Sequence, residues 1–175
     1  MTATASISTS TLDSRRQHGR AVNAVAAFLR DRLHLPNVYI EPKLHSSIRA
    51  DVLAIDRAGS GDIHIAEIKL SPGLHDNRAN WIQFVGLKQL GEVPAHFRYL
   101  VLPNTPKARD LGEKNILFSP DGIGRIGVLL LSQQGNAIPR VELLIEPERF
   151  RLDIAGAERV ERYLSRSKPD MFVRI

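Results

Sequence analysis

The sequence predicts an α/β fold with a single mixed β-sheet flanked by helices. Segments of strand length, rich in Ile, Val and Leu, alternate with longer segments whose apolar residues recur at helical spacing. The chain has 175 residues, too few for two large domains, and it carries no internal repeat. We therefore expect one domain over residues 14–175, with its elements in the order α-β-β-β-α-β-α-β-β.

The first helix is expected over residues 14–34, where apolar side chains recur at helical spacing, at Val22, Val25, Ala26 and Leu29. Asp13 or Ser14 can serve as its N-cap. Pro36 ends it, because proline lacks the backbone N–H and disfavours helix just before it. The residues ahead of the helix are rich in Thr, Ser and Ala, so we expect 1–13 to form a disordered tail.

The later elements are predicted from helical spacing of apolar residues and from short apolar segments of strand length. Residues 48–55 and 63–70 are strand-like, and the glycine-rich stretch between them has turn chemistry, which predicts a hairpin. The other expected elements are a strand at 38–40, a helix at 78–90, a strand at 97–102, a short helix at 106–114, strands at 127–131 and 141–145, and a helix within 158–165.

Positive charge is concentrated towards the N-terminus. Lys and Arg number 24 against 19 Asp and Glu, which gives a net charge of +5, and residues 14–49 hold that whole excess. Any attraction for a polyanion is therefore expected in the N-terminal third of the chain. A solvated basic helix face explains the same pattern.

The chain contains no cysteine, which excludes disulfides, thiolate zinc sites and cysteine nucleophiles. This composition suits a reducing cytosol, and we expect a cytoplasmic protein. The apolar runs are far shorter than the roughly 20 residues that span a bilayer, so no membrane segment is expected.

Two carboxylates and a lysine lie near the ends of the predicted hairpin strands. A hairpin centred on Gly59 places Asp51 opposite Glu67, and Arg49 opposite Lys69. Opposed side chains have Cβ atoms roughly 4.5–5.5 Å apart, and like charges at that separation destabilise a sheet. A divalent cation compensates for the repulsion, because Mg²⁺ takes carboxylate oxygens and waters as ligands. The pattern predicts an acid pair, a metal ion and a lysine on one face.

Such a site suits phosphodiester hydrolysis. The metal polarises a phosphoryl oxygen and lowers the pKa of a bound water, while the ammonium orients that water or offsets developing charge. The structural alternative is that Asp51 pairs with Arg49 or Lys69, and that Glu67 and Lys69 form an exposed charge pair at a sheet edge. Spacing alone leaves both open, because a slip of two residues preserves the alternation.

The segments Arg49–Ile55 (RADVLAI) and Ile63–Lys69 (IHIAEIK) together resemble the PD-(D/E)XK nuclease superfamily. The likeness extends in outline to the αβββαβ core of that superfamily, over about residues 14–102. Within it, the chain looks most like Holliday-junction resolvases and the nuclease domains of restriction-type enzymes. The resemblance implies a restriction-endonuclease-like fold and a metal-dependent nuclease that acts on DNA.

The resemblance also implies a role for each matching residue. Asp51, Glu67 and the main-chain carbonyl of Ile68 would bind Mg²⁺ or Mn²⁺, and Lys69 would act on the attacking water. The helix that follows offers two candidates for touching the active site or the nucleic-acid backbone, Gln83 and Lys88. Arginines would hold phosphates, at Arg15, Arg16, Arg20 and Arg49.

Some positions depart from the superfamily pattern. Many members carry a glutamate on the first helix as an extra ligand, whereas this helix has Asn23 at mid-length and only Asp31 near its end. Glu41, at the end of the first strand, can supply a third carboxylate or cap the turn before Pro42. Ala50 stands in place of the motif's proline, at a position that contributes no ligand.

The sequence leaves the substrate form open among duplex, junction, single strand and RNA. The main alternative to a nuclease is a catalytically inactive protein of the same fold that acts as a nucleic-acid-binding or protein-interaction module. A homodimer fits the resemblance, because cleavage of two strands needs two sites. None of the six histidines has a metal-binding spacing, and we expect none of them to be a ligand.

Overall fold

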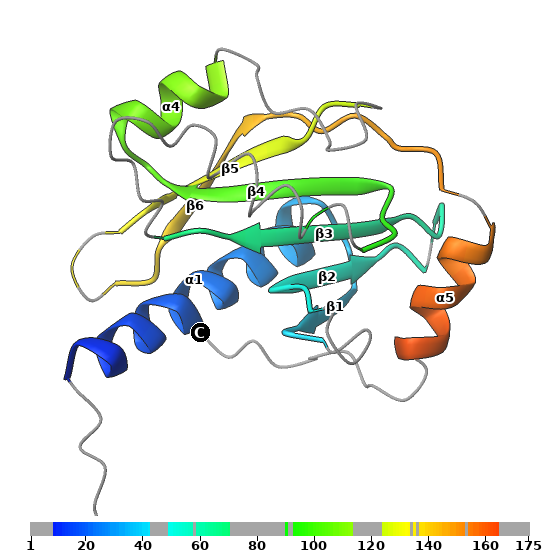
Figure 1. Cartoon of the computed structure of the whole chain (residues 1–175), viewed down its shortest axis with the longest axis horizontal. Helices are drawn as coiled ribbons and strands as arrows, with labels where there is room; N and C mark the ends of the chain where they lie inside the picture. Colours follow the sequence, from blue (N-terminus) through cyan, green and yellow to red (C-terminus); the bar gives the residue numbers. More distant parts are fainter. Residues whose placement is uncertain are drawn as a thin grey trace, which may run out of the picture.

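The computed structural model contains a six-stranded mixed sheet flanked by helices, which confirms the predicted fold class (Figure 1). The elements are α1 (Thr9–Arg32), β1 (Asn37–Ile40), β2 (Val52–Ile55), β3 (Ile63–Ile68), β4 (Phe97–Pro103), α4 (Pro106–Glu113), β5 (Gly127–Ser132), β6 (Arg140–Ile145) and α5 (Ile154–Leu164). The structure describes residues 9–42, 49–57, 59–70, 90, 93–113, 124–133, 135, 137–152 and 154–164.

The strands lie side by side in chain order, from β1 at one edge to β6 at the other. β3, β4 and β5 run parallel, and the remaining neighbours pair antiparallel. In the β2–β3 hairpin, Val52 lies opposite Ala66 and Leu53 opposite Ile65. This is the predicted register, and its continuation by one residue sets Asp51 against Glu67.

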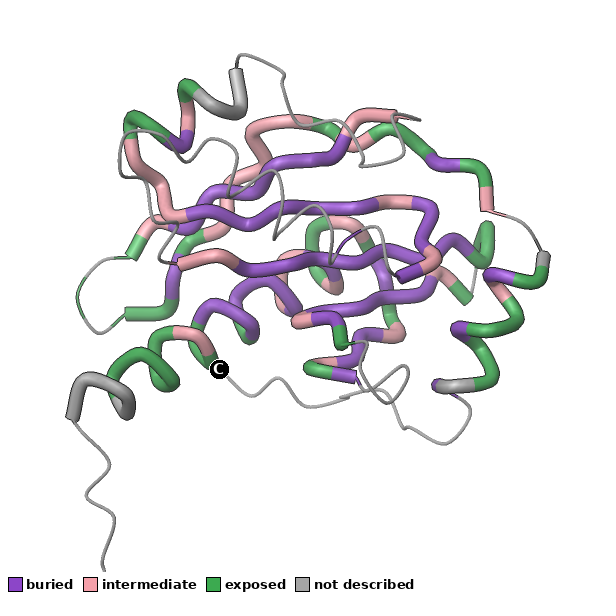
Figure 2. The backbone as a smooth tube through the Cα atoms, in the orientation of Figure 1, coloured by how far each residue is buried: buried purple, intermediate pink, exposed green. Residues whose placement is uncertain are grey.

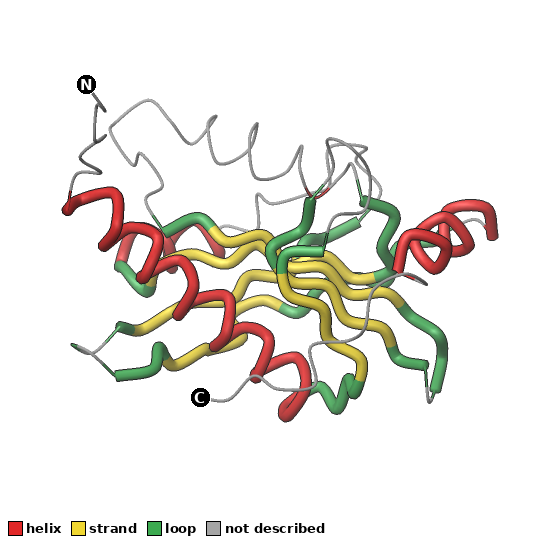
Figure 3. Tube along the Cα trace, turned by 90° about the horizontal axis from the view of Figure 1, so that it is seen from below, coloured by secondary structure: helices red, strands yellow, loops and turns green. Residues whose placement is uncertain are grey.

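Each face of the sheet buries its own apolar core, as alternation along the strands requires. α1 crosses one face and packs on a cluster that includes Val52, Ala66 and Val101 (Figure 3). The other face carries a cluster that includes Leu53 and Ile65, and it also receives apolar side chains of α4 and α5, at Ala108, Val160 and Leu164. The strands in the middle of the sheet are consequently buried along most of their length (Figure 2).

The first helix begins at Thr9, earlier than the expected N-cap at Asp13 or Ser14. Residues 9–13, expected to belong to a disordered tail, are therefore helical, and residues 1–8 lie outside the described residues. No proline or glycine interrupts the sequence between Thr9 and His18, so the helix extends towards the N-terminus without a local signal to stop it. No described helix is both long and apolar enough to cross a membrane.

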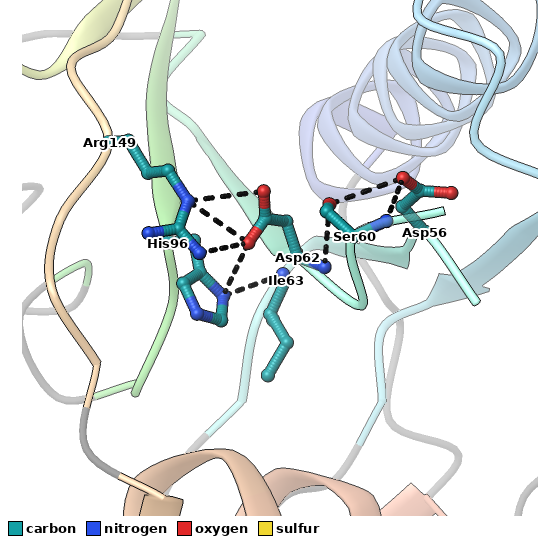
Figure 4. A network of polar contacts seen from close by, with 6 residues as sticks. All are labelled: Asp56, Ser60, Asp62, Ile63, His96 and Arg149. Carbon is teal, nitrogen blue, oxygen red and sulfur yellow. Dashed lines mark hydrogen bonds and ion pairs between the residues drawn. The ribbon is translucent and has the colours of Figure 1, made fainter. Parts of the chain in front are cut away.

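The hairpin turn is closed by Asp56, whose Oδ2 accepts hydrogen bonds from the backbone N–H and the hydroxyl of Ser60 (Figure 4). Gly61 adopts a φ of 73°, in the left-handed region that glycine enters without a steric penalty. These two features hold the centre of the hairpin, and with it the register of both strands.

A second polar network ties the beginning of β3 to the C-terminal segment. Arg149 donates from Nη2 to Asp62 Oδ1 at 2.7 Å, and the N–H of Ile63 donates to His96 Nδ1 at 2.9 Å (Figure 4). The guanidinium of Arg149 lowers the pKa of Asp62. These contacts hold the beginning of β3 against the C-terminal segment, and we assign the network a structural role.

Candidate active site

Asp51 stands just before β2, where the ends of β1, β2 and β3 meet. The N–H of Glu41 donates to the Asp51 carbonyl at 2.9 Å, which continues the β1–β2 pairing by one residue. The Asp51 carboxylate turns towards β3, where its Oδ2 accepts a hydrogen bond of 2.7 Å from the N–H of Ile68. Asp51 therefore links the ends of β1, β2 and β3 through its carbonyl oxygen and Oδ2. Its other carboxylate oxygen, Oδ1, takes no part in these two hydrogen bonds.

Glu67 and Lys69 form a short ion pair at the end of β3. Lys69 Nζ donates to Glu67 Oε1 at 2.7 Å, and the lysine and glutamate side chains are only 16% and 7% exposed. The backbone N–H of Lys69 donates to the carbonyl of Val101 at 2.9 Å, which holds the lysine against β4. The prediction that these side chains share a face is confirmed, whereas the alternative of a solvent-exposed pair is not, because both are largely buried.

The electrostatics of the site are those of a crowded acid pair. Burial raises the pKa of Glu67, the negative charge of Asp51 raises it further, and the ammonium of Lys69 opposes both effects. A bound cation would relieve the effect of this neighbouring negative charge on Glu67. A carboxylate perturbed in this way occurs more often at functional sites than elsewhere.

His18 of α1 is a neighbour of the acids that is absent from the predicted site residues. Its Nε2 lies 3.4 Å from Asp51 Oδ1 and 3.5 Å from Glu41 Oε1. The hydrogen bond to Asp51 raises the pKa of His18, while its partial burial opposes the rise. The histidine spacings give no reason to place it there. No local sequence signal marks His18, because its contact with Asp51 depends on how α1 packs over the ends of β1 and β2.

Glu41 adopts an unusual backbone conformation. Its φ is 45°, in the left-handed region that non-glycine residues rarely enter, and it precedes Pro42, which normally pushes the preceding residue towards extended structure. Such strain persists only where the surroundings impose it, and it concentrates at functional sites. The Glu41 side chain remains 58% exposed, so it lies at the rim of the site beside His18.

The residues fit a magnesium ion better than a zinc ion. Among the described residues, no three or more His, Cys, Asp or Glu side chains are arranged to hold a metal by themselves. Mg²⁺ needs no such cage, because it keeps several waters and is usually held by one or two carboxylates. Asp51 and Glu67 are two such carboxylates, and a bound cation would relieve the repulsion between their negative charges.

The predicted phosphate-binding residues are placed in part. Arg15, Arg16 and Arg20 are exposed on the same half of α1 as His18, and Arg49 is exposed two residues before Asp51. The elements that carry Asp51 and His18 therefore also carry exposed positive charge. The two candidates on the predicted helix over 78–90, Gln83 and Lys88, lie outside the described residues.

Comparisons with known proteins show likeness of fold alone. No family model and no curated protein matches the sequence. Among solved structures, the chain is similar to the SPO1766 protein of unknown function from Silicibacter pomeroyi, with a TM-score of 0.52 and 16% identity over 85% of this chain and 83% of that chain. Pyrococcus furiosus SfsA in complex with Ca²⁺ aligns with a TM-score of 0.38 and 16% identity, over 77% of this chain and 64% of that chain. A shared fold does not fix a function, which depends on the residues of the site.

Proposed function

We propose that this protein is a metal-dependent nuclease of the PD-(D/E)XK type that hydrolyses phosphodiester bonds in DNA. The observation that carries the proposal is the meeting of Asp51, Glu67 and Lys69 at adjacent strand ends, with the two acids close enough for Asp51 to raise the pKa of Glu67. The same three residues match the superfamily motif. The exposed arginines of α1 supply the positive surface that a polyanionic substrate needs.

Each residue has a distinct task in this proposal. Asp51 and Glu67, with the Ile68 carbonyl and Glu41 beside them, would hold the metal, which supplies Lewis acidity and an acidified water when bound. Lys69 would leave Glu67 as the metal arrives and hold the attacking water or the developing negative charge with its ammonium. The N–H of Ile68 keeps the Asp51 carboxylate aimed at the site.

A second candidate is a nucleic-acid-binding or protein-interaction module on the same scaffold. The Lys69–Glu67 contact of 2.7 Å favours it, because a direct ion pair already neutralises one of the two acids. In that case the acid pair is a structural joint between strands, and the basic half of α1 is the functional surface.

The two candidates are separated by incubating the protein with supercoiled plasmid, single-stranded DNA, a four-way junction and RNA. Each substrate is tested with Mg²⁺, with Mn²⁺ and with a chelator, and binding is measured in parallel by fluorescence anisotropy. The nuclease proposal expects cleavage of at least one DNA substrate with metal and none with chelator, and cleavage of RNA alone would contradict the assignment of DNA as substrate. Salt-dependent binding without cleavage of any substrate would establish the module instead, and neither binding nor cleavage would contradict both.

A further inference from the structure

An open groove runs between the C-terminal end of α1 and the edge strand β6, away from the acid pair. It has a volume of about 620 Å³ and is lined by Phe28, Arg32, Leu33 and residues 140–143. A shallower extension of about 270 Å³ continues past Ile138, a large apolar side chain that is 53% exposed. From His18 to Arg32 the helix advances about 21 Å at 1.5 Å per residue, so the groove is separate from the candidate active site.

One wall of the groove is a strand edge without a neighbour among the described strands. β6 pairs with β5 on one side, and no described strand pairs with its other side. The opposite edge strand, β1, has only four residues, whereas β6 has six, and the β6 side chains are half-buried or exposed. An edge of this length presents backbone N–H and C=O groups that can accept another strand.

The floor of the groove is apolar and its rim is basic. Phe28, Leu33, Val141 and Leu143 are half-buried against the core beneath α1. Arg32 and Arg140 are exposed, and neither forms an ion pair within the described part of the chain. The acids that lie nearby are already engaged, since Glu142 accepts from Arg109 and Asp31 from Arg30, at 2.6 Å in each case.

We propose that this groove binds an extended acidic segment of a partner protein, which adds as a seventh strand to β6. Backbone hydrogen bonds to the β6 edge would fix the segment. Apolar side chains at alternate positions would then enter the floor formed by Phe28, Leu33, Val141 and Leu143, as side chains along a strand alternate in direction. Carboxylates between them would point to the opposite face, on which Arg140 alternates with Val141, while Arg32 at the end of α1 would attract acidic side chains electrostatically.

The groove suits a peptide better than a nucleic-acid backbone. A phosphodiester chain has no strand edge with which to pair β6, and it gains nothing from the half-buried floor of aliphatic and aromatic carbon. An acidic strand uses all three features at once: the open edge, the apolar floor and the two rim arginines. This proposal does not depend on the proposed nuclease activity, since none of its residues belongs to the acid pair or its surroundings.

The test uses the full chain and a fluorescein-labelled ten-residue peptide that alternates glutamate with valine. A second peptide replaces glutamate with lysine. The variant Arg32→Glu/Arg140→Glu reverses the rim charges, and Arg151→Glu/Arg159→Glu reverses two exposed arginines elsewhere as a matched control. We expect saturable binding of the acidic peptide alone. Rim reversal should weaken it about tenfold or more, as the loss of two ion pairs predicts, and the control should not.

Amide hydrogen exchange locates the bound peptide independently of affinity. Protection of residues 140–145 on peptide addition, with no change at 37–40, is the expected result, because only the β6 edge gains hydrogen bonds. The proposal is overturned by no saturation up to millimolar peptide, by equal binding of the lysine peptide, or by equal weakening in the control variant. It is also overturned if duplex DNA competes for the groove, or if sedimentation shows a dimer of this chain that rim reversal dissociates.

Discussion

The ammonium of Lys69 sits 2.7 Å from Glu67 Oε1, two positions away on the same face of the chain as it leaves β3. Alternation of side chains along a strand brings such residues together without any help from a turn or a helix. The register of the hairpin then adds Asp51, whose carboxylate accepts a hydrogen bond from the N–H of Ile68. A buried acid, its cation and a second acid therefore arise from two short strands.

Asp51 has a structural task that a metal-binding role alone does not require. Asp51→Ala should destabilise the protein by about 1–3 kcal/mol, because it leaves the N–H of Ile68 without its acceptor. Asp51→Asn should cost clearly less, since an amide oxygen can still accept that hydrogen bond and the charge repulsion with Glu67 is gone. Chemical denaturation of both variants measures the difference. Equal losses of stability would show that the hydrogen bond contributes little.

His18 should affect metal binding through the carboxylates that it contacts. Removing a group that holds metal ligands in place typically costs ten- to a hundredfold in affinity, and we expect about that loss for His18→Ala in Mn²⁺ titration calorimetry. The matched control is Asn23→Ala, an exposed position on the same helix. Unchanged Mn²⁺ affinity in His18→Ala would mean that Asp51 and Glu41 keep their positions without the imidazole.

The basic half of α1 should determine how nucleic-acid binding depends on salt. Each duplex-DNA phosphate that an arginine neutralises adds roughly 0.9 to the steepness of log K against log salt. Replacing Arg15, Arg16 and Arg20 with alanine should therefore reduce the steepness of log K against log salt by up to about 2.7, or about 0.9 for each arginine. Anisotropy titrations at several salt concentrations measure it, with Arg159→Ala as the control. If the slopes of variant and control coincide, these arginines are merely a solvated helix face.

His64 should make the protein less stable in mild acid. Burial lowers its pKa to about 4, from the ordinary value of 6.5. Between these two pH values, His64 binds a proton in the unfolded chain but not in the folded chain. The free energy of unfolding therefore falls as pH drops from 6.5 to 4, by up to about 3 kcal/mol at about 1.4 kcal/mol per pKa unit. His64→Phe keeps the stacking on Phe97 and removes the titrating group.

Denaturation of wild type and His64→Phe at about pH 7 and about pH 4.5 compares their losses of stability on either side of this transition. The variant should lose less stability than wild type, and His34→Asn, a change at an exposed histidine with a φ of 57°, should behave as wild type. A His64→Phe protein as acid-sensitive as wild type would assign the pH dependence to other groups, such as His96.

The strands and their register could be predicted because local rules set both. Apolar runs bounded by turn residues located β2 to β5, and the turn around Gly59 and Gly61 determined that Asp51 faces Glu67. The pairing of acids and lysine followed from the period of two alone. Asp51, Glu67 and Lys69 all belong to one hairpin, so local sequence patterns are sufficient to predict that they lie together.

The contribution of α1 could not be predicted, because it depends on how a helix crosses a sheet. His18 meets Asp51 only through the packing of α1 against Val52 and Ala66, residues far away in the sequence. The left-handed φ of Glu41 could not be predicted from the sequence either, because the residue before a proline is normally extended. Long-range packing, rather than local propensity, decides these features.

The most direct test of the account is the rate at which the protein nicks supercoiled plasmid in Mg²⁺, compared among wild type, Lys69→Met and Glu158→Gln. Glu158 is an exposed carboxylate on α5, so its variant controls for a general change of charge. We predict metal-dependent nicking by wild type and by Glu158→Gln, and a loss of about a hundredfold or more in Lys69→Met, which lacks the cation beside Glu67. Equal nicking by Lys69→Met and wild type would contradict the account, and so would the failure of all three proteins to cleave plasmid, single-stranded DNA and the four-way junction.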